Sequence, residues 1–213
     1  MKNRNSSNLL MNHIQEHSSL YLFHTVLFLM GVVFGAIVVN SLSPTQKEDL
    51  FYFINEFFGQ VQQGDILEAK DVFVHSFKYN SKYLGLMWIL GISMIGLPII
   101  MLLLFLKGMV IGFSVGFLVQ QMGWQGFFMS VFTVLPQNII IIPLFIMGAV
   151  ITVSFSIQMI KKLFVKTMFQ PFGQLFVQYC MQFGIALVFL AIAAFIEGYI
   201  TPYLMKGFLQ LIH

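Results

Sequence analysis

Long apolar runs, separated by short polar segments, dominate the pattern of the chain. A run of about 20 residues is long enough to cross a bilayer as a helix. Because backbone groups in lipid must be hydrogen-bonded within their own segment, we predict that these runs are helices. The predicted spans are 20–42, 83–106, 108–136, 139–160 and 181–204. They indicate an all-α, polytopic helical membrane protein with about five transmembrane helices in one domain, 1–213.

The predicted span 108–136 is the least regular of the five. Its clean apolar run ends at Val119, and glutamines, glycines and Trp124 precede a second short apolar piece that ends at Pro136. Two readings are open: one broken helix, or a span followed by a re-entrant half-helix, which we favour. Irregular backbone at membrane depth is tolerated only where it is buried in protein or lines a cavity.

The one sizeable polar segment, 43–82, is predicted to contain two short amphipathic helices. Pro44 and the pair Thr45 and Glu48 are typical of a helix start, and apolar residues recur at helical spacing in both halves. The two helices either lie on the membrane surface with their apolar side down or form a docking surface for an extracytoplasmic partner, and the two readings are compatible. The candidate partner-binding residues are Phe53, Phe57, Phe73 and Phe77.

Composition excludes several classes of protein. Hydrophobic residues make up 58% of the chain and charged residues 9%, against about 45–50% and about 25% in soluble domains. A soluble enzyme is therefore excluded, and a net charge of +3 gives no basic face for a nucleic acid. The single cysteine, Cys180, can build neither a disulfide framework nor a cysteine-based metal site.

The positive residues predict an orientation, because lysine and arginine near span ends favour the cytoplasmic side. Lys2 and Arg4, Lys107, and the lysines of 161–166 fall on one side if there are five crossings. We therefore expect 1–19 and 161–180 in the cytoplasm, and 43–82 and the carboxyl terminus outside. The first run is too long for the apolar region of a cleaved signal peptide, and no A-x-A site follows it, so we expect it to remain as a span.

Candidate intramembrane chemistry centres on Glu197, the only acid inside a predicted span. An intramembrane carboxylate is costly and suggests function, so Glu197 is either a structural polar anchor or a group that handles protons or a ligand. Gln137 and Asn138 follow Pro136 in the middle of the fold, and broken helices of this kind often frame transporter sites. A small transporter or channel is therefore the alternative function.

Small residues recur at every fourth position in two of the spans, as Gly31 and Gly35, and as Gly108, Gly112 and Gly116. This spacing lets helix axes approach closely in lipid. Packing within the chain is the favoured use, and a homo-oligomer contact is the alternative.

The segment His13–His17 matches an H-x-x-E-H zinc pattern. The acids that could supply a third ligand lie mostly across the membrane in the predicted topology, so an interfacial polar turn is the favoured reading. We predict no catalytic residue, metal or cofactor.

Several long segments closely resemble the stage II sporulation protein M family of endospore-forming bacteria. They are the residues 14–21, 31–41, 82–93 and 117–124. The wider superfamily is similar at a set of single positions: Asn80, Gly108, Gly112, Leu135, Pro136, Pro143, Glu197, Thr201 and Pro202.

The resemblance implies a multi-pass protein of the bacterial cytoplasmic membrane, located at the sporulation septum and needed for engulfment. It implies a scaffold without catalysis that anchors stage II sporulation proteins D and P, which degrade septal peptidoglycan. Membrane lipid is the other expected contact, and no nucleic acid is expected.

Overall fold

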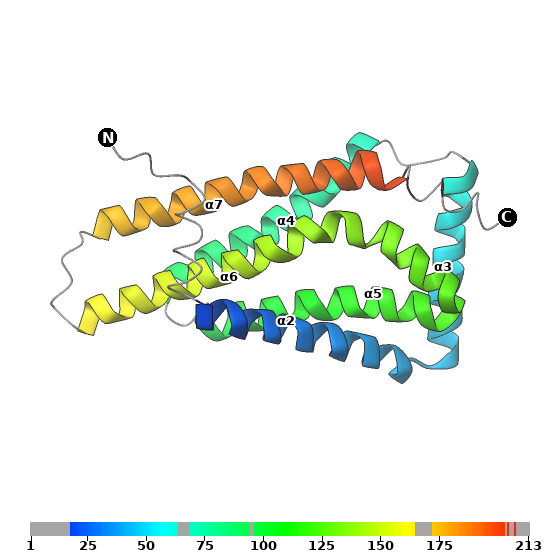
Figure 1. Ribbon diagram of the computed structural model, residues 1–213, viewed down its shortest axis with the longest axis horizontal. Helices are drawn as coiled ribbons and strands as arrows, with labels where there is room; N and C mark the ends of the chain where they lie inside the picture. The colour runs from blue at the N-terminus through cyan, green and yellow to red at the C-terminus, as the bar shows by residue number, and fades with distance from the viewer. Residues whose placement is uncertain are drawn as a thin grey trace.

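The computed structural model describes residues 18–63, 69–93, 96–164 and 172–202, together with residues 204 and 207. Within them, five long helices run side by side along an elongated bundle and a sixth, α3, lies across one end (Figure 1). All of the regular elements in these ranges are helical, which confirms the all-α prediction. The elements are α2 Ser18–Val38, the 3-10 helix η1 Val39–Ser41, α3 Pro44–Gln63, α4 Ala69–Ile92, α5 Gly96–Thr133, α6 Leu135–Phe164, α7 Phe172–Phe195 and the π-helix η2 Ile196–Ile200.

Four helical stretches in the described residues are long and apolar enough to cross a membrane. They are Ser18–Ser41, Gly96–Thr133, Leu135–Lys162 and Phe172–Ile200. The fifth helix of the bundle, α4, is not among them because its first half is polar. The chain is therefore a multi-pass membrane protein in which one bundle helix has a charged outer side.

The structure corrects the predicted span 83–106, because the chain turns inside it. α4 ends at Ile92 and α5 begins at Gly96, and the amide of Ser93 donates to the carbonyl of Leu90 at 3.1 Å. Pro98 is the third residue of α5. At this position the backbone N–H would have no partner within the helix, so proline removes no hydrogen bond. The apolar run is continuous through this turn. Hydropathy alone therefore predicted one helix where the structure has two.

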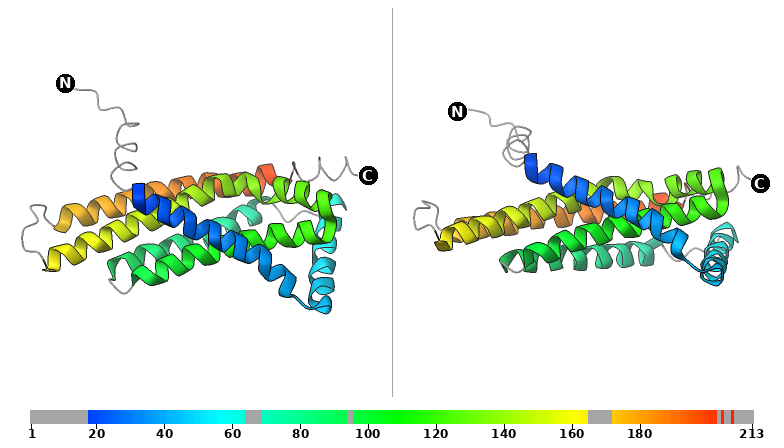
Figure 2. Two further views of the ribbon diagram at one scale, coloured as in Figure 1. Left: turned by 60° about the horizontal axis from the view of Figure 1, so that its bottom comes forward. Right: turned by 90° about the horizontal axis from the view of Figure 1, so that it is seen from below.

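The predicted span 108–136 also differs from the structure. The helix that begins at Gly96 runs to a reversal at Gly123, where φ is 56°, and residues 124–133 fold back along it (Figures 1 and 2). A Cβ at Gly126 would overlap the carbonyl oxygen of Leu118, which shows how closely the two arms approach. The returning arm continues through a turn at Val134 into α6. Residues 124–133 are thus the first part of the crossing that α6 continues. They are not a re-entrant half-helix that leaves the membrane on the side where it entered.

Gly123→Ala is expected to destabilise the protein by about 1–3 kcal/mol, because only glycine adopts this backbone conformation without strain. A Cβ at this position would meet nothing within 4 Å, so the cost comes from the backbone alone. Thermal unfolding in detergent measures it. Gly59→Ala, also open around its Cβ but helical, is the matched control, and an equal effect of both substitutions would contradict the prediction.

The second predicted amphipathic helix is not a separate element. The first corresponds to α3, whereas Phe73 and Phe77 belong to α4, which enters the bundle. Their rings stack on each other with centroids 6.1 Å apart, and Phe77 packs against the hydrophobic core. Both side chains are only partly buried, so their role in binding an outside partner stays a prediction.

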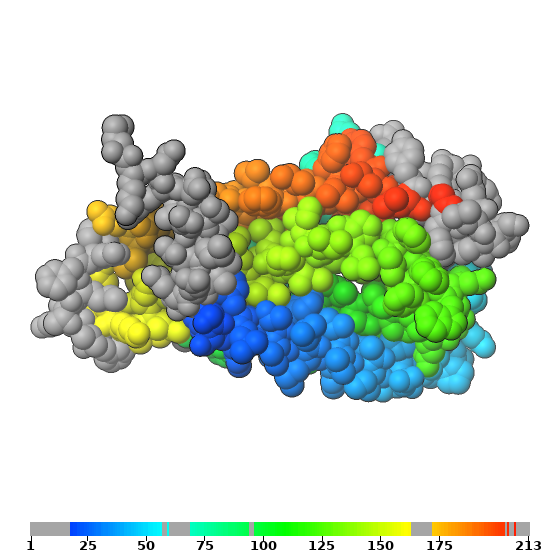
Figure 3. All heavy atoms as spheres, in the orientation of Figure 1, coloured from blue at the N-terminus to red at the C-terminus, as the bar shows by residue number. Residues whose placement is uncertain are grey.

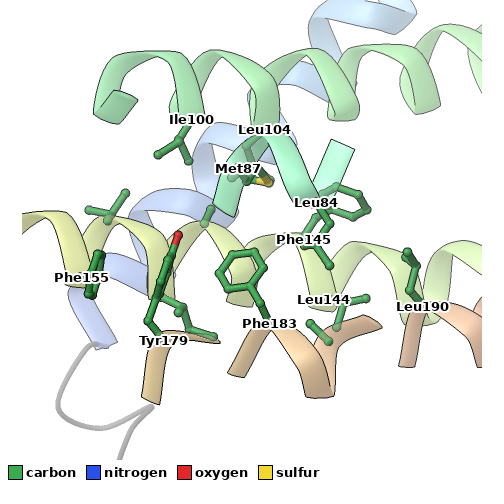
Figure 4. Packing of buried hydrophobic residues seen from close by; sticks show 14 of the residues in the cluster. Leu84, Met87, Ile100, Leu104, Leu144, Phe145, Phe155, Tyr179, Phe183 and Leu190 are labelled. Carbon is green, nitrogen blue, oxygen red and sulfur yellow. The ribbon is translucent and has the colours of Figure 1, made fainter. Parts of the chain in front are cut away.

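The core lies where α4, α5, α6 and α7 meet. Figure 4 shows Leu84 and Met87 of α4 packed beside Leu104 of α5, with Phe145 of α6 and Phe183 of α7 close by. Tyr179 adds a hydrogen bond between α7 and α4, since its hydroxyl donates to the carbonyl of Trp88 at 2.8 Å. This apolar packing fixes the relative positions of the four helices that carry the polar groups described below.

The most extensive helix pairing in the described residues joins α2 and α5. The five glycines predicted to serve in helix packing all lie at this contact: a Cβ at Gly31, Gly35, Gly108, Gly112 or Gly116 would meet the opposite helix. At four of them it would overlap a backbone carbonyl oxygen. The other side of α2 carries exposed large side chains such as Leu22, Met30 and Val33, and α2 lies along one edge of the molecule in Figure 3.

Candidate functional site

Glu197 lies in the short π-helix that follows α7. A π-turn inserts an extra residue and re-aims the side chains around it, and such turns recur at functional sites. Gly198 lets this turn approach α4 closely, since a Cβ there would lie 2.7 Å from the carbonyl oxygen of Ala69 and 3.1 Å from the amide nitrogen of Phe73. The carboxylate of Glu197 is thereby held against α4.

Two neighbouring helices supply hydrogen bonds to this carboxylate. The hydroxyl of Ser76, on α4, donates to Oε2 of Glu197. The amide of Gln137, on α6, donates to Oε1 and Oε2 at 3.1 and 2.9 Å when its nitrogen faces the carboxylate. Hydrogen bonds to an ionised group are about twice as strong as neutral ones, so these contacts offset part of the cost of burying the charge.

The network continues along α4 to a partly buried cation. Nδ2 of Asn80 donates to the backbone carbonyl of Ser76 at 3.1 Å and to its hydroxyl at 3.4 Å. Oδ1 of Asn80 accepts a hydrogen bond from Nζ of Lys107 at 2.8 Å. Asn80 therefore links the two charged ends, accepting from the lysine and donating toward the serine.

Aromatic rings surround the Lys107 ammonium group. It lies 5.1, 5.6 and 5.0 Å from the ring centroids of Tyr79, Tyr83 and Phe145. Ring faces attract a cation, and more strongly where water is excluded. α4 and α6 thus stabilise a positive charge in the middle of α5, so Lys107 does not mark a span end, and its use as an orientation signal was wrong.

The charges of Lys107 and Glu197 are opposite in sign and belong to one network. Lys107 and Glu197 attract each other electrostatically and are joined through Asn80 and Ser76. A lone charge among apolar helices costs several kcal/mol, whereas a paired and hydrogen-bonded one is tolerated. The arrangement ties α4, α5, α6 and η2 together and can carry polarity, or a proton, between its ends.

The structure brings together only some of the residues predicted for this site. Glu197 and Gln137 are in contact, but Asn138 is buried elsewhere and donates to the carbonyl of Val134 at 2.6 Å. Ser76, Asn80 and Lys107 were not among the predicted site residues. The signal for Ser76 and Asn80 is their helical spacing, because the same face of α4 continues to the buried Leu84, four residues on, and to Met87, three residues further.

The predicted partner-binding residues are dispersed. Phe53 is on α3 with 65% of its surface exposed, and Phe57 is on the same helix but its side chain is outside the described set. Tyr52, which sequence reasoning did not select, is 67% exposed next to Phe53, with ring centroids 6.2 Å apart. Among the side chains of α3 that the structure describes, Tyr52 and Phe53 thus form the exposed aromatic surface.

Histidine, cysteine and acidic side chains in the described residues form no group of three that could hold a metal ion. The segment His13–His17 lies outside the described residues, so its predicted lack of a metal stays a prediction.

Comparison with known proteins identifies the family. The model of the family "Stage II sporulation protein M" matches residues 24–202, which is most of the chain. No curated protein and no solved structure matches the chain. The family match spans all five bundle helices and includes every residue of the polar network. The chain is therefore a sporulation-related membrane protein that belongs to the stage II sporulation protein M family.

Proposed function

We propose that this protein is the membrane anchor of the sporulation engulfment complex. It recruits and holds the peptidoglycan-degrading stage II sporulation proteins D and P at the septum, and it performs no catalysis itself. α3 is the contact surface for these enzymes, and the bundle is the base that keeps α3 at the membrane.

The observation that carries this proposal is the position of α3. It lies across one end of the bundle (Figures 1 and 2) and makes at most slight contact with any other described element. It nevertheless exposes Tyr52 and Phe53 side by side. Aromatic residues of this kind dominate the binding energy of protein interfaces, and the packing of the bundle does not require them here.

The proposed orientation has the amino terminus in the cytoplasm and α3 outside, where the septal wall lies. α2 and α7 begin, and α6 ends, toward one end of the bundle, and α3 and η2 lie at the other end (Figure 1). Lys161 and Lys162 near the end of α6 support this orientation by the positive-inside rule, without any contribution from Lys107.

Replacing both Tyr52 and Phe53 by serine is expected to reduce recovery of proteins D and P about tenfold or more, because exposed aromatic anchors are lost. The measurement is a crosslinked pull-down of tagged protein from sporulating cells, normalised to its amount in the membrane. That amount should not change, since both side chains are largely exposed.

Phe172→Ser is the matched control, since Phe172 is 49% exposed and is the first residue of α7, which begins at the end of the bundle away from α3 (Figure 1). Equal recovery of both enzymes by the α3 variant and by wild type would reject α3 as the contact surface. Loss of the α3 variant from the membrane would instead support the reading of α3 as an interfacial helix.

A small transporter is the second candidate function, and the Glu197 network is the observation that favours it. Intramembrane carboxylates connected to hydroxyl and amide groups serve as proton relays in transporters. This function requires Glu197 itself, whereas the scaffold requires only a stable bundle. A variant with both Lys107→Met and Glu197→Gln separates the two functions.

A further inference from the structure

α4 and α7 enclose a groove of about 390 Å³ on the side of the bundle. Ser81 and Gly85 of α4 and Cys180 and Gly184 of α7 line it, together with core residues such as Leu84. The lining is almost entirely apolar, so whatever occupies the groove within a membrane must itself be largely apolar.

Both walls of the groove carry small residues spaced by four, Ser81 with Gly85 and Cys180 with Gly184. A Cβ at Gly85 or at Gly184 would meet nothing within 4 Å in the described structure. The α2–α5 contact uses the same spacing and fills it with the backbone of the opposite helix. Small residues at this spacing allow close helix approach in lipid, and here the chain itself does not use them.

Ser81 places the groove at membrane depth. It lies 11 residues from the end of α4 at Ile92, about 16 Å along the helix, which is about half of a hydrocarbon layer about 30 Å thick. Its hydroxyl oxygen is buried within the protein, so the surface that the groove offers to an occupant is apolar.

Two lysines lie beside the groove. Lys78 and Lys82 precede Ser81 and Gly85 by three residues each, and residues three apart are neighbours on a helix surface. Both are exposed, and no ion pair of theirs occurs among the described residues. Because an unpaired lysine at membrane depth is costly, the charge of this surface favours an occupant that carries a carboxylate.

We propose that the α4–α7 groove binds one membrane-spanning helix of a partner protein. That helix packs small residues against Gly85 and Gly184 and places an acidic side chain near Lys82. A second copy of this chain does not fit, because a two-fold contact would set groove against groove and lysine against lysine. This groove is separate from the contact surface on α3. It binds its partner helix whether or not α3 is occupied.

The test places a photoreactive diazirine amino acid at Leu187, which lines the groove, in sporulating cells, and maps the crosslinked peptides by mass spectrometry. We expect a crosslink to a membrane-spanning segment of another protein that contains Asp or Glu. Gly184→Leu fills the groove without meeting any described atom at its Cβ, and should reduce the crosslink at least tenfold. Val188→Phe, on the exposed side of α7, is the control and should not change it.

Crosslinks only to lipid, only to a second copy, or to no partner would overturn the proposal, as would a crosslink that survives Gly184→Leu. Lys82→Glu is a second variant that does not rely on groove filling; it should also reduce the crosslink severalfold, because it sets an acid against the acid of the partner helix. The variant with Tyr52→Ser and Phe53→Ser should retain the groove crosslink. Failure at α3 and failure at the groove are therefore distinguishable.

Discussion

Replacing Lys107 by Met, or Glu197 by Gln, should each destabilise the protein by about 3–5 kcal/mol, because each leaves the opposite charge of the network uncompensated. The double variant should lie within about 1 kcal/mol of wild type, since replacing both members of a partly buried charge pair with neutral groups is often close to neutral. Both effects are measured as the free energy of unfolding of the purified protein in detergent. They depend on the connection from Lys107 through Asn80 and Ser76 to Glu197.

Lys161→Met is the matched control for loss of a lysine. Lys161 is exposed near the end of α6, and its replacement should change stability by less than about 0.5 kcal/mol. A double variant as unstable as the sum of the two single variants would mean that the charges act independently. A double variant that is stable but fails to support sporulation would favour the transport function over the scaffold.

Gly112→Ala should be the most damaging single-methyl substitution, with a loss of about 3 kcal/mol or more. The new Cβ would overlap the backbone carbonyl of Val32, and a backbone atom cannot rotate away as a flexible side chain can. α2 would have to move outward from α5, which also separates Gly31, Gly35 and Gly108 from their contacts. Overpacking in a tight contact typically costs 1–3 kcal/mol, and here it spreads along the most extensive helix pairing.

Gly85→Ala is the control for this substitution, measured on the isolated protein. Its Cβ would meet nothing within 4 Å, and alanine is favoured over glycine in a helix by about 1 kcal/mol. It should therefore be neutral or slightly stabilising in thermal unfolding. If both variants unfold at the same temperature, the close contact of α2 with α5 does not determine stability.

The apolar pattern predicted the class of the fold and most of its helices, but it missed two reversals. Within 83–106 every position near the turn is apolar or small, so hydropathy gives no sign that α4 ends at Ile92. The local signal was Ser93 and Gly96 followed by Pro98, which is typical of a helix start. The reversal at Gly123 depends on a single positive φ, which composition alone does not reveal.

The candidate site was predicted only at its acidic end. Glu197 was conspicuous because no other acid lies in an apolar run, and its contact with Gln137 crosses 60 residues of sequence. Lys107 was assigned to a span end because the turn near Ile92 was missed, so its role as the opposite charge was also missed. Ser76 and Asn80 were placed in an outer loop for a related reason. The charged residues on the outer side of α4 made its first half look like a polar loop, so its buried side was not recognised.

The polar network also has a direction along the bilayer normal, which couples it to the membrane potential. Ser76 precedes Asn80 by one turn in α4, which starts at the α3 end, so Glu197 is held about 6 Å nearer the outside than Lys107 in the proposed orientation. A potential that is negative inside favours this order of charges. Moving one charge across the whole bilayer at 100 mV is worth about 2.3 kcal/mol, so a separation of about one fifth of the hydrocarbon layer contributes about 0.5 kcal/mol. An energised membrane therefore holds these helices together more firmly than a depolarised one.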